Sequence, residues 1–166
     1  MVDLKIKLLS KTAELPEYAL NSDVAFDVRA DESLDINSFE QREVKTGFAM
    51  KIPEGYIGLV RDRVGLITKM GLHVVAGTFN HLYADEVTIV MINFSKEEIH
   101  IDKGMRIAQI VLIPVKKLKI KKVDSIPKTE RSGREKGSTG LKEIIRELNS
   151  LSEKGAKKIK KSKKKK

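Results

Sequence analysis

The stretch GLHVVAGTFNHLYADEV, residues 71–87, decides the fold class, because it sets two apolar segments on either side of a polar tip. Short apolar segments joined by a tight bend are typical of a β-hairpin. We expect two strands folded back on each other here, with Asn80, His81 and Tyr83 at the bend. Polar and aromatic side chains on such a bend mark a candidate binding site.

Strand patterns continue on both sides of this hairpin. Apolar residues alternate with polar ones near each end of the β region, at Val2, Leu4, Ile6 and Leu8 and again at Leu118 and Ile120. Each alternation predicts a half-buried strand. Near-continuous apolar runs, which predict strands buried on both faces, cover residues 56–60, 87–94 and 107–115, and turn residues at 53–55 and 102–104 separate them. Many short strands at close spacing predict a sandwich, barrel or jelly roll.

One helical period is clear, and it lies near the C-terminal end. Apolar residues recur every three or four positions at Leu141, Ile144, Ile145, Leu148 and Leu151. Ser138 or Thr139 can cap the start of this helix and Gly155 can end it. Such a helix packs on the β domain or meets a partner, and packing on the domain is the simpler interpretation.

Composition limits the class of protein. The 166 residues are 40% hydrophobic and 34% charged, which is typical of a soluble chain with one main domain. The sequence has no cysteine, so disulfides and thiolate metal sites are excluded. The N-terminal residues show no long apolar segment and no run approaches the length needed to cross a bilayer. We therefore expect a cytoplasmic protein with no membrane partner.

The net charge of +10 belongs almost entirely to the C-terminal tail. Residues 142–166 hold eleven basic and three acidic residues, a net +8, which leaves 22 basic and 20 acidic residues, a net +2, in the rest. The final lysine-rich block, residues 155–166, repels itself and lacks apolar area to bury, so disorder is expected. Lysines near phosphates release counterions, so this tail is also a candidate for weak, sequence-independent nucleic-acid contact.

Two segments carry candidate phosphate chemistry. The three histidines are scattered without metal-ligand spacing, and neither a Ser-His-Asp order nor a Walker-type glycine loop is present. RDRVGL at 61–66 supplies arginines, and ERSGREKGSTG at 130–140 combines arginines, hydroxyls and glycines before a helix. Loop amides and such side chains can clasp a phosphate. Taken alone, the second segment is more simply a Gly- and Ser-rich linker.

Five segments in order resemble the trimeric dUTPase family. They are PEYALNSDVAFDVRA (16–30), VKTGFAMKIPEGYIGLVRDRVGL (44–66), GLHVVAGTFNHLYADEVTIVMIN (71–93), KGMRIAQIVLIPV (103–115) and ERSGREKGSTG (130–140). Asp27 matches the acidic residue of the first motif, and Arg63 and Gly65 match the second. Gly77 and Tyr83 lie in the third, uracil-binding motif, and Gln109 matches the fourth. The fifth motif, a C-terminal arm, includes Arg131, Gly137, Ser138 and Thr139.

The resemblance implies an all-β subunit with a β-clip or distorted jelly-roll fold, to which the apolar period described above adds a short C-terminal helix. We expect a β domain over 1–140 that includes the arm at about 128–140, followed by the amphipathic helix at 141–154 and the lysine-rich tail at 155–166. It also implies a homotrimer with shared active sites and Mg²⁺-dependent hydrolysis of dUTP, or a related deoxynucleotide, to the monophosphate and diphosphate. The implied ligands of the substrate are Arg63, Gly65, Gly77, Tyr83, Gln109, Arg131, Gly137, Ser138 and Thr139. Asp27 is implied in catalysis and as a weak metal contact, with Mg²⁺ held mostly by the triphosphate.

One departure from the family pattern bears directly on catalysis. Asn80 stands where the family has an Asp that activates the attacking water and bonds the sugar hydroxyl. An amide keeps the shape and the hydrogen bonds but cannot take up a proton, and general-base assistance is typically worth about 10² to 10⁴ in rate. His81 or Asp85 is an alternative base, although adjacent residues of a regular strand point to opposite faces. We therefore expect weakened or altered hydrolysis.

Other departures and alternatives accompany this one. Val64 replaces a phosphate-binding Ser, and Lys136 replaces the aromatic residue of the arm. The related dCTP deaminases use a Glu on the strand after the hairpin, where this chain has Val90 and Met91, so deamination is not expected. Two alternatives to a working dUTPase stay open: a catalytically inactive deoxynucleotide-binding protein, and a β scaffold that binds nucleic acid through its basic tail.

Overall fold

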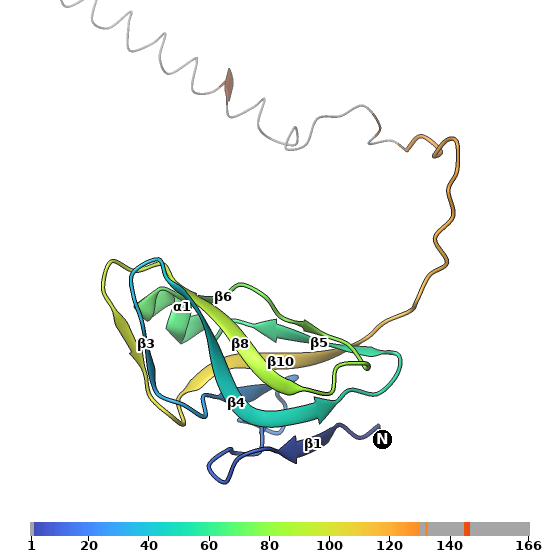
Figure 1. Cartoon of the computed structure of the whole chain (residues 1–166). Helices are drawn as coiled ribbons and strands as arrows, with labels where there is room; N and C mark the ends of the chain where they lie inside the picture. The colour runs from blue at the N-terminus through green and yellow to red at the C-terminus, as the bar shows by residue number, and fades with distance from the viewer. Residues whose placement is uncertain (1, 130–131, 133–144, 147–166) are drawn as a thin grey trace, which may run out of the picture. The chain divides into compact units, whose positions relative to one another are not determined.

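The computed structural model describes residues 2–129, 132 and 145–146 (Figure 1). The chain divides into two units, residues 1–119 and 120–166. The first unit contains all eleven elements of regular structure whose bounds are given below. In the second unit, residues 120–129 form no strand or helix, while Ile145 and Arg146 are helical and exposed. The helix expected over 141–154 and the tail at 155–166 otherwise lie outside the described residues.

The first unit consists of antiparallel sheets. One has the order β1 (Lys5–Leu8), β4 (Gln41–Lys51), β8 (Glu86–Asn93), β6 (Leu72–Val74), and the second has the order β2 (Ala25–Arg29), β10 (Arg106–Pro114), β5 (Tyr56–Arg61), β7 (Thr78–Phe79). A third sheet pairs β3 (Leu34–Ile36) with β9 (Ile99–Ile101). Sequence neighbours are often not sheet neighbours, so the chain crosses repeatedly between sheets, as expected of an all-β fold.

The sheets share one hydrophobic core. Along β8, Val87, Ile89 and Met91 are buried while the residues between them are only partly buried. From the other four-stranded sheet, β10 contributes Ile107 and Ile110 to the same core. β8 thus covers the core with one face, which is the period of two that a pleated sheet imposes, whereas β2 buries the consecutive residues Phe26, Asp27 and Val28. The apolar runs predicted these strands correctly, but burial on both faces was wrong for β8.

The segment 71–87, expected to be one hairpin, has its two parts in different sheets. β6 folds back on β8, with His73 opposite Ile92, as expected. β7, however, pairs with β5 in the other four-stranded sheet, with Phe79 opposite Gly58. The segment 71–87 therefore carries its polar bend from one sheet to the other.

The N-terminal alternation predicted β1 correctly, whereas the second alternation was wrong. Leu118 is 73% exposed and Ile120 is 95% exposed, and neither lies in a strand. An alternating segment becomes a half-buried strand only where a neighbouring strand and an apolar face are available. Among the described residues, no strand pairs with this lysine-flanked segment.

The sequence did not reveal the short helix α1 (Val64–Met70), which follows β5 directly. Its seven residues cover two turns and bury only Leu66, so no repeating apolar period marks it. Gly71 ends the helix in a left-handed conformation, with φ 76°, and its N–H donates to Ile67 O. This helix places Arg63 at its N-cap position.

A bulge interrupts the pairing of β4 with β8. Lys45 pairs with Thr88 but Ala49 pairs with Glu86, so β4 carries two more residues than β8 across this interval. Gly47 lies inside the bulge with φ +69°, and a Cβ built there would lie 2.5 Å from Asp31 Oδ2. Both the backbone conformation and the lack of space require glycine at this position.

We expect Gly47→Ala to destabilise the protein by about 2–5 kcal/mol, because a positive φ costs about 1–2 kcal/mol and an overpacked site about 1–3 kcal/mol. Urea unfolding of the variant and the parent measures this loss. Gly55→Ala is the matched control, since Gly55 has φ +83° but no atom within 4 Å of its Cβ position. Equal losses in the two variants would contradict a steric role for Asp31.

Two acidic residues flank His100 at the two-stranded β3–β9 sheet. His100 Nδ1 lies 2.5 Å from Asp35 Oδ1 and Nε2 lies 3.4 Å from Asp102 Oδ1. The hydrogen bond with Asp35 raises the pKa of His100 above its ordinary value of 6.5, against a smaller opposing effect of desolvation. The folded state therefore binds this proton more tightly than the unfolded state does.

The stabilisation by protonated His100 is expected in full below pH 6.5 and to disappear as the pH rises through the folded-state pKa. The difference in melting temperature between the parent and His100→Gln is thus largest in mildly acidic buffer and shrinks towards pH 8. Thermal unfolding across this range tests the expectation. Asp35→Asn is a second variant, which removes the other member of the His100–Asp35 pair. A difference in melting temperature that does not depend on pH would count against a stabilising role of this pair.

Candidate functional site

Asp27 is the centre of a polar cluster at the junction of β2, β5 and β10. Its residue is only 4% exposed, although it is charged and lies on a strand. β2 pairs with β10 so that Asp27 is opposite Gln109, and Gln109 Nε2 donates to Asp27 Oδ1 at 3.1 Å. The sheet register therefore brings together two of the residues that the sequence predicted, 82 positions apart in the chain.

Two arginines neutralise this buried carboxylate. Arg63 Nε donates to Asp27 Oδ1 at 3.1 Å, and Arg106 Nε lies 3.3 Å from Asp27 Oδ2. The Arg106 contact meets the distance of an ion pair but not the geometry of a hydrogen bond, so its buried Nε lacks a hydrogen-bond partner within the described chain. We regard the contact as electrostatic, because opposite charges attract at this separation whatever the N–H direction.

The cluster keeps a surplus of positive charge. Two guanidinium groups against one carboxylate give a net +1, and the arginine side chains are 30% and 38% exposed while Asp27 is 3% exposed. The extended backbone of Arg63, with φ −85° and ψ 122°, leads into α1, and its side chain makes no capping bond to the helix. Partly exposed guanidinium groups with donors to spare are suited to binding an anion such as a phosphate.

The residues that the structure describes do not form a magnesium site of their own. Both oxygens of Asp27 face arginine or glutamine nitrogens, which compete directly with a metal ion. Within residues 2–129, 132 and 145–146, no group of three or more His, Asp or Glu side chains is placed to hold a metal. Asp27 therefore does not fit as a direct Mg²⁺ ligand in this arrangement.

The hairpin bend is a turn built by Asn80. Asn80 Oδ1 accepts the N–H of Leu82 at 2.8 Å, and Asn80 O accepts the N–H of Tyr83 at 3.1 Å. Regular strand geometry ends at Phe79, so the opposite-face rule does not apply to His81. Lys51 Nζ donates to His81 O at 2.6 Å and fixes the bend from the end of β4.

Tyr83 lies against the base of the bend. Its ring centroid is 4.9 Å from that of Phe79, and its hydroxyl donates to Glu86 O at 2.6 Å. Burial, and secondarily the negative charges of Asp85, Glu43 and Glu86, raise the pKa of Tyr83. The phenol consequently stays protonated near neutral pH and keeps its hydrogen bond to the backbone.

The two glycines singled out by sequence have different surroundings. A Cβ on Gly77 would lie 2.4 Å from Val60 Cβ, and Gly77 O accepts the N–H of Val60 at 2.8 Å. Gly77 is thus required for close contact of the hairpin with β5. A Cβ on Gly65 would meet no atom within 4 Å, so packing inside the described chain does not explain this glycine.

The candidate residues form two groups in the described chain. Asp27, Arg63 and Gln109 meet in the cluster, while Gly77, Asn80 and Tyr83 lie on the hairpin, and no hydrogen bond or ion pair between described residues joins the two groups. The arm residues Arg131, Gly137, Ser138 and Thr139 lie outside the described residues.

Sequence reasoning missed two side chains that the structure places in these groups. Arg106 is the second cation on Asp27, and Lys51 is the cation on the hairpin bend. An Arg three residues before Gln109, at the start of an apolar strand, was a usable signal for the first. Lys51 had no comparable signal, because it reaches the bend from 30 positions away.

The sequence pattern of the dUTPase family matches residues 11–140. The chain belongs to the dUTPase family. The deoxyuridine 5'-triphosphate nucleotidohydrolase of Hydrogenobaculum sp. is 39% identical over 142 residues, which cover 84% of this chain and 99% of that protein. The same enzyme of Aquifex aeolicus is 40% identical over 147 residues, covering 85% and 98% of the two chains.

Solved structures of phage dUTPases share the fold. A variant of the Staphylococcus bacteriophage 80α dUTPase with dUpNHpp has a TM-score of 0.79 and 28% identity, and the match covers 85% of this chain and all of that one. The dUTPase of S. aureus phage phi11, in a form described with a structural Mg(II) ion, has a TM-score of 0.71 and 25% identity. The match covers 75% of this chain and 98% of that one. The β-clip or jelly-roll fold expected from the sequence is thereby confirmed.

We expect Asp27→Asn to destabilise the protein by about 1–3 kcal/mol. The change leaves Arg63 and Arg106 without their anion, and the cost is lower than for a fully buried pair because both arginines reach water. Urea unfolding measures the loss. Asp85→Asn is the control, since Asp85 is exposed and accepts no hydrogen bond from a described residue. A loss no larger than that of the control would show that the arginines do not depend on Asp27.

Proposed function

We propose that this protein is a dUTP diphosphatase that converts dUTP and water to dUMP and diphosphate. Membership of the dUTPase family and 32–40% identity with named deoxyuridine 5'-triphosphate nucleotidohydrolases support this activity. The observation that carries the proposal within the chain itself is the Asp27 cluster, in which Arg63, Arg106 and Gln109 converge on one buried carboxylate.

In this proposal, the surplus positive charge of the cluster stabilises the triphosphate. Phosphoryl transfer depends mainly on positioning and charge stabilisation, and guanidinium groups supply both. Asp27 holds the arginines in place, since they are long side chains that would otherwise sample many rotamers. The open space beside Gly65 suits the close approach of a phosphate to the backbone.

The hairpin is proposed to bind the nucleoside. The Phe79–Tyr83 pair offers an aromatic platform for a deoxyribose, and Tyr83 would exclude a 2′-hydroxyl. Asn80 uses its side-chain oxygen for the turn and has only its amide N–H groups left to offer a ligand. We therefore propose efficient binding with slow hydrolysis, because the water-activating carboxylate of the family is missing.

The remaining partners are also proposals. Mg²⁺ is proposed to arrive with the triphosphate, because Asp27 is already occupied, and the phi11 relative is described with a structural Mg(II) ion. A homotrimer would let the Asp27 cluster of one subunit face the hairpin of another, which suits the separation of the two groups within one chain. The arm residues Arg131, Gly137, Ser138 and Thr139 would close the site. Nucleic-acid contact by the tail and a cytoplasmic location stay predictions.

Asn80→Asp is expected to raise dUTP turnover by about 10² to 10⁴. The two side chains have nearly the same shape, and an Asp oxygen can still accept the Leu82 N–H, so the turn is retained while a proton acceptor is added. Diphosphate release with Mg²⁺ measures the change, with dCTP and dTTP as competing substrates in the same assay. Preference for dCTP or dTTP over dUTP would overturn the substrate assignment.

Asn80→Ala is the matched control and should not gain activity, since it adds no base. In the parent protein, His81→Ala and Asp85→Ala test the two alternative bases. If the parent already turns over as fast as Asn80→Asp, and one of these changes abolishes that activity, the base has been relocated and the proposal of slow hydrolysis is wrong.

A further inference from the structure

Glu86 holds two separate structural elements together. It is the first residue of β8 and follows the hairpin bend directly. Its carboxylate Oε1 accepts the N–H of Gly47 in the β4 bulge at 2.8 Å, and its backbone carbonyl accepts the Tyr83 hydroxyl at 2.6 Å. The side chain of Glu86 therefore anchors Glu86 to the β4 bulge, while the backbone carbonyl of Glu86 holds the hydroxyl of Tyr83.

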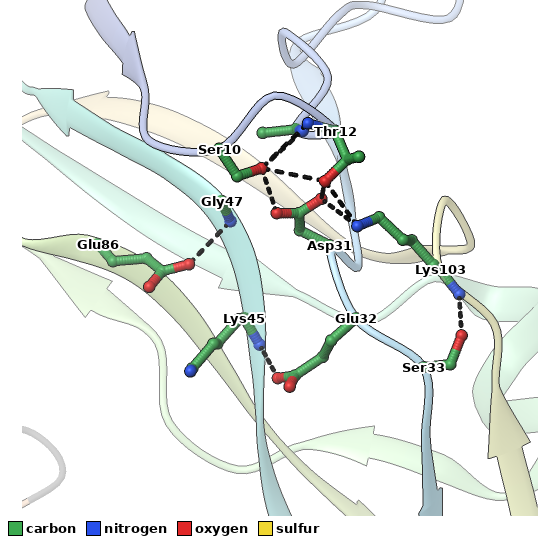
Figure 2. A network of polar contacts seen from close by, with 10 residues as sticks. Ser10, Thr12, Asp31, Glu32, Ser33, Lys45, Gly47, Glu86 and Lys103 are labelled. Atoms are coloured by element: carbon green, nitrogen blue, oxygen red, sulfur yellow. Dashed lines mark hydrogen bonds and ion pairs between the residues drawn. The ribbon is translucent and has the colours of Figure 1, made fainter.

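The position of Gly47 is also fixed by contacts on the side away from Glu86. Its carbonyl accepts the N–H of Leu9 at 2.7 Å, and Asp31 occupies the space beside its Cα. Figure 2 shows the network around Asp31, in which Ser10, Thr12 and Lys103 converge on the carboxylate, with Glu86 reaching Gly47 from the other side.

The network that supports Gly47 is itself well ordered. Asp31 receives hydrogen bonds from Ser10 at 2.5 Å and Thr12 at 2.7 Å, and Lys103 Nζ lies 3.2 Å from it. Desolvation opposes ionisation of Asp31, but these three partners outweigh it and lower the pKa of this carboxyl. Asp31 is therefore ionised near neutral pH, as its contacts require.

The other contacts of Tyr83 do not reach its hydroxyl, since its ring packs on Phe79 and its N–H donates to Asn80 O. Asn80 closes the turn on itself, and Lys51 holds only the carbonyl of His81. The hydroxyl of Tyr83 bonds to the carbonyl of Glu86, which pairs with Ala49 at the edge of the β4 bulge, where regular pairing of β4 with β8 ends. The Glu86–Gly47 bond adds a second constraint on Glu86 beside this one pairing.

We propose that Glu86 is a positioning residue that sets the orientation of Tyr83 by anchoring the start of β8 to Gly47, and that it thereby determines the discrimination between deoxyribo- and ribonucleotides. This inference rests on the proposed function for its nucleotide part. Its structural part concerns the hairpin alone and is measurable without any nucleotide.

Two substitutions of Glu86 separate the bond from the charge. Glu86→Gln keeps an oxygen that can accept the Gly47 N–H, so the bend should be retained. Glu86→Ala removes the acceptor and leaves the Gly47 N–H without its partner. If Glu86→Ala does not fold, Glu86→Asp replaces it, because an Asp is one methylene too short to reach Gly47 from the same backbone position.

Glu32→Ala is the matched control. Glu32 Oε1 accepts the N–H of Lys45 at 2.8 Å, which is the same kind of bond to the same bulge, but Glu32 makes no contact with the hairpin. The residue lies on the opposite flank of β4 in Figure 2. A general loosening of the bulge should therefore affect both variants, whereas positioning of Tyr83 should be lost only with Glu86.

The first measurement is the rate of amide hydrogen exchange at Leu82 and Tyr83, which NMR monitors in the protein without nucleotide. We expect Glu86→Ala to speed exchange by roughly tenfold, with Glu86→Gln and Glu32→Ala within about twofold of the parent. The second is the ratio of affinities for non-hydrolysable dUTP and UTP analogues with Mg²⁺. We expect this ratio to fall about five- to tenfold in Glu86→Ala and in Tyr83→Phe, and to be retained in Glu86→Gln.

Three results would overturn the inference. Unchanged exchange and an unchanged affinity ratio in Glu86→Ala would show that Tyr83 is held by other contacts. Equal effects of Glu32→Ala would reduce the role of Glu86 to general stability, and failure of Glu86→Gln to keep the parent ratio would show that the charge acts instead of the bond. A parent that binds neither analogue would refute the proposed function, while the exchange data would still decide whether Glu86 fixes the bend.

Discussion

The buried carboxylate of Asp27 is the constraint on which the candidate site depends. A charge that is 4% exposed is costly unless cations and hydrogen-bond donors compensate it, and here Arg63, Arg106 and Gln109 do so. Asp27 in turn holds the guanidinium groups of Arg63 and Arg106 close together, and the three side chains keep a net charge of +1. In the proposed function, this positively charged cluster is the site that binds the triphosphate.

The hairpin shows how a chemical role and a structural role can separate. Asn80 retains the turn that an Asp would make, since its side-chain oxygen accepts the Leu82 N–H, but it gives up the capacity to accept a proton. Tyr83 and Gly77 meanwhile keep contacts that depend on shape and backbone alone. In the proposed function, nucleotide binding and proton transfer therefore depend on different atoms of the same bend, and binding persists without efficient hydrolysis.

How much could be predicted from sequence depended on the range of the interaction involved. Strands such as β8 and β10 were predictable because their apolar residues are contiguous. Asp27 and Gln109 were each singled out by the family motifs, but their pairing across β2 and β10 became visible only in the structure. Helix α1 was missed because seven residues show no period, and Leu118 and Ile120 misled because their alternation has no partner strand among the described residues. Lys51 was not predicted because its partner lies 30 positions away along the chain, whereas the position of Arg106 beside Gln109 was a signal that went unused.

The bulge in β4 has a consequence for how this chain can change in length. Its inward-facing residues Val44, Thr46, Phe48 and Met50 alternate without interruption through the bulge, because the register shift is two residues and a strand repeats every two. Insertions or deletions in pairs would keep every one of these side chains facing the core. A change of a single residue would instead move the side chains on one side of it from the core face to the solvent face.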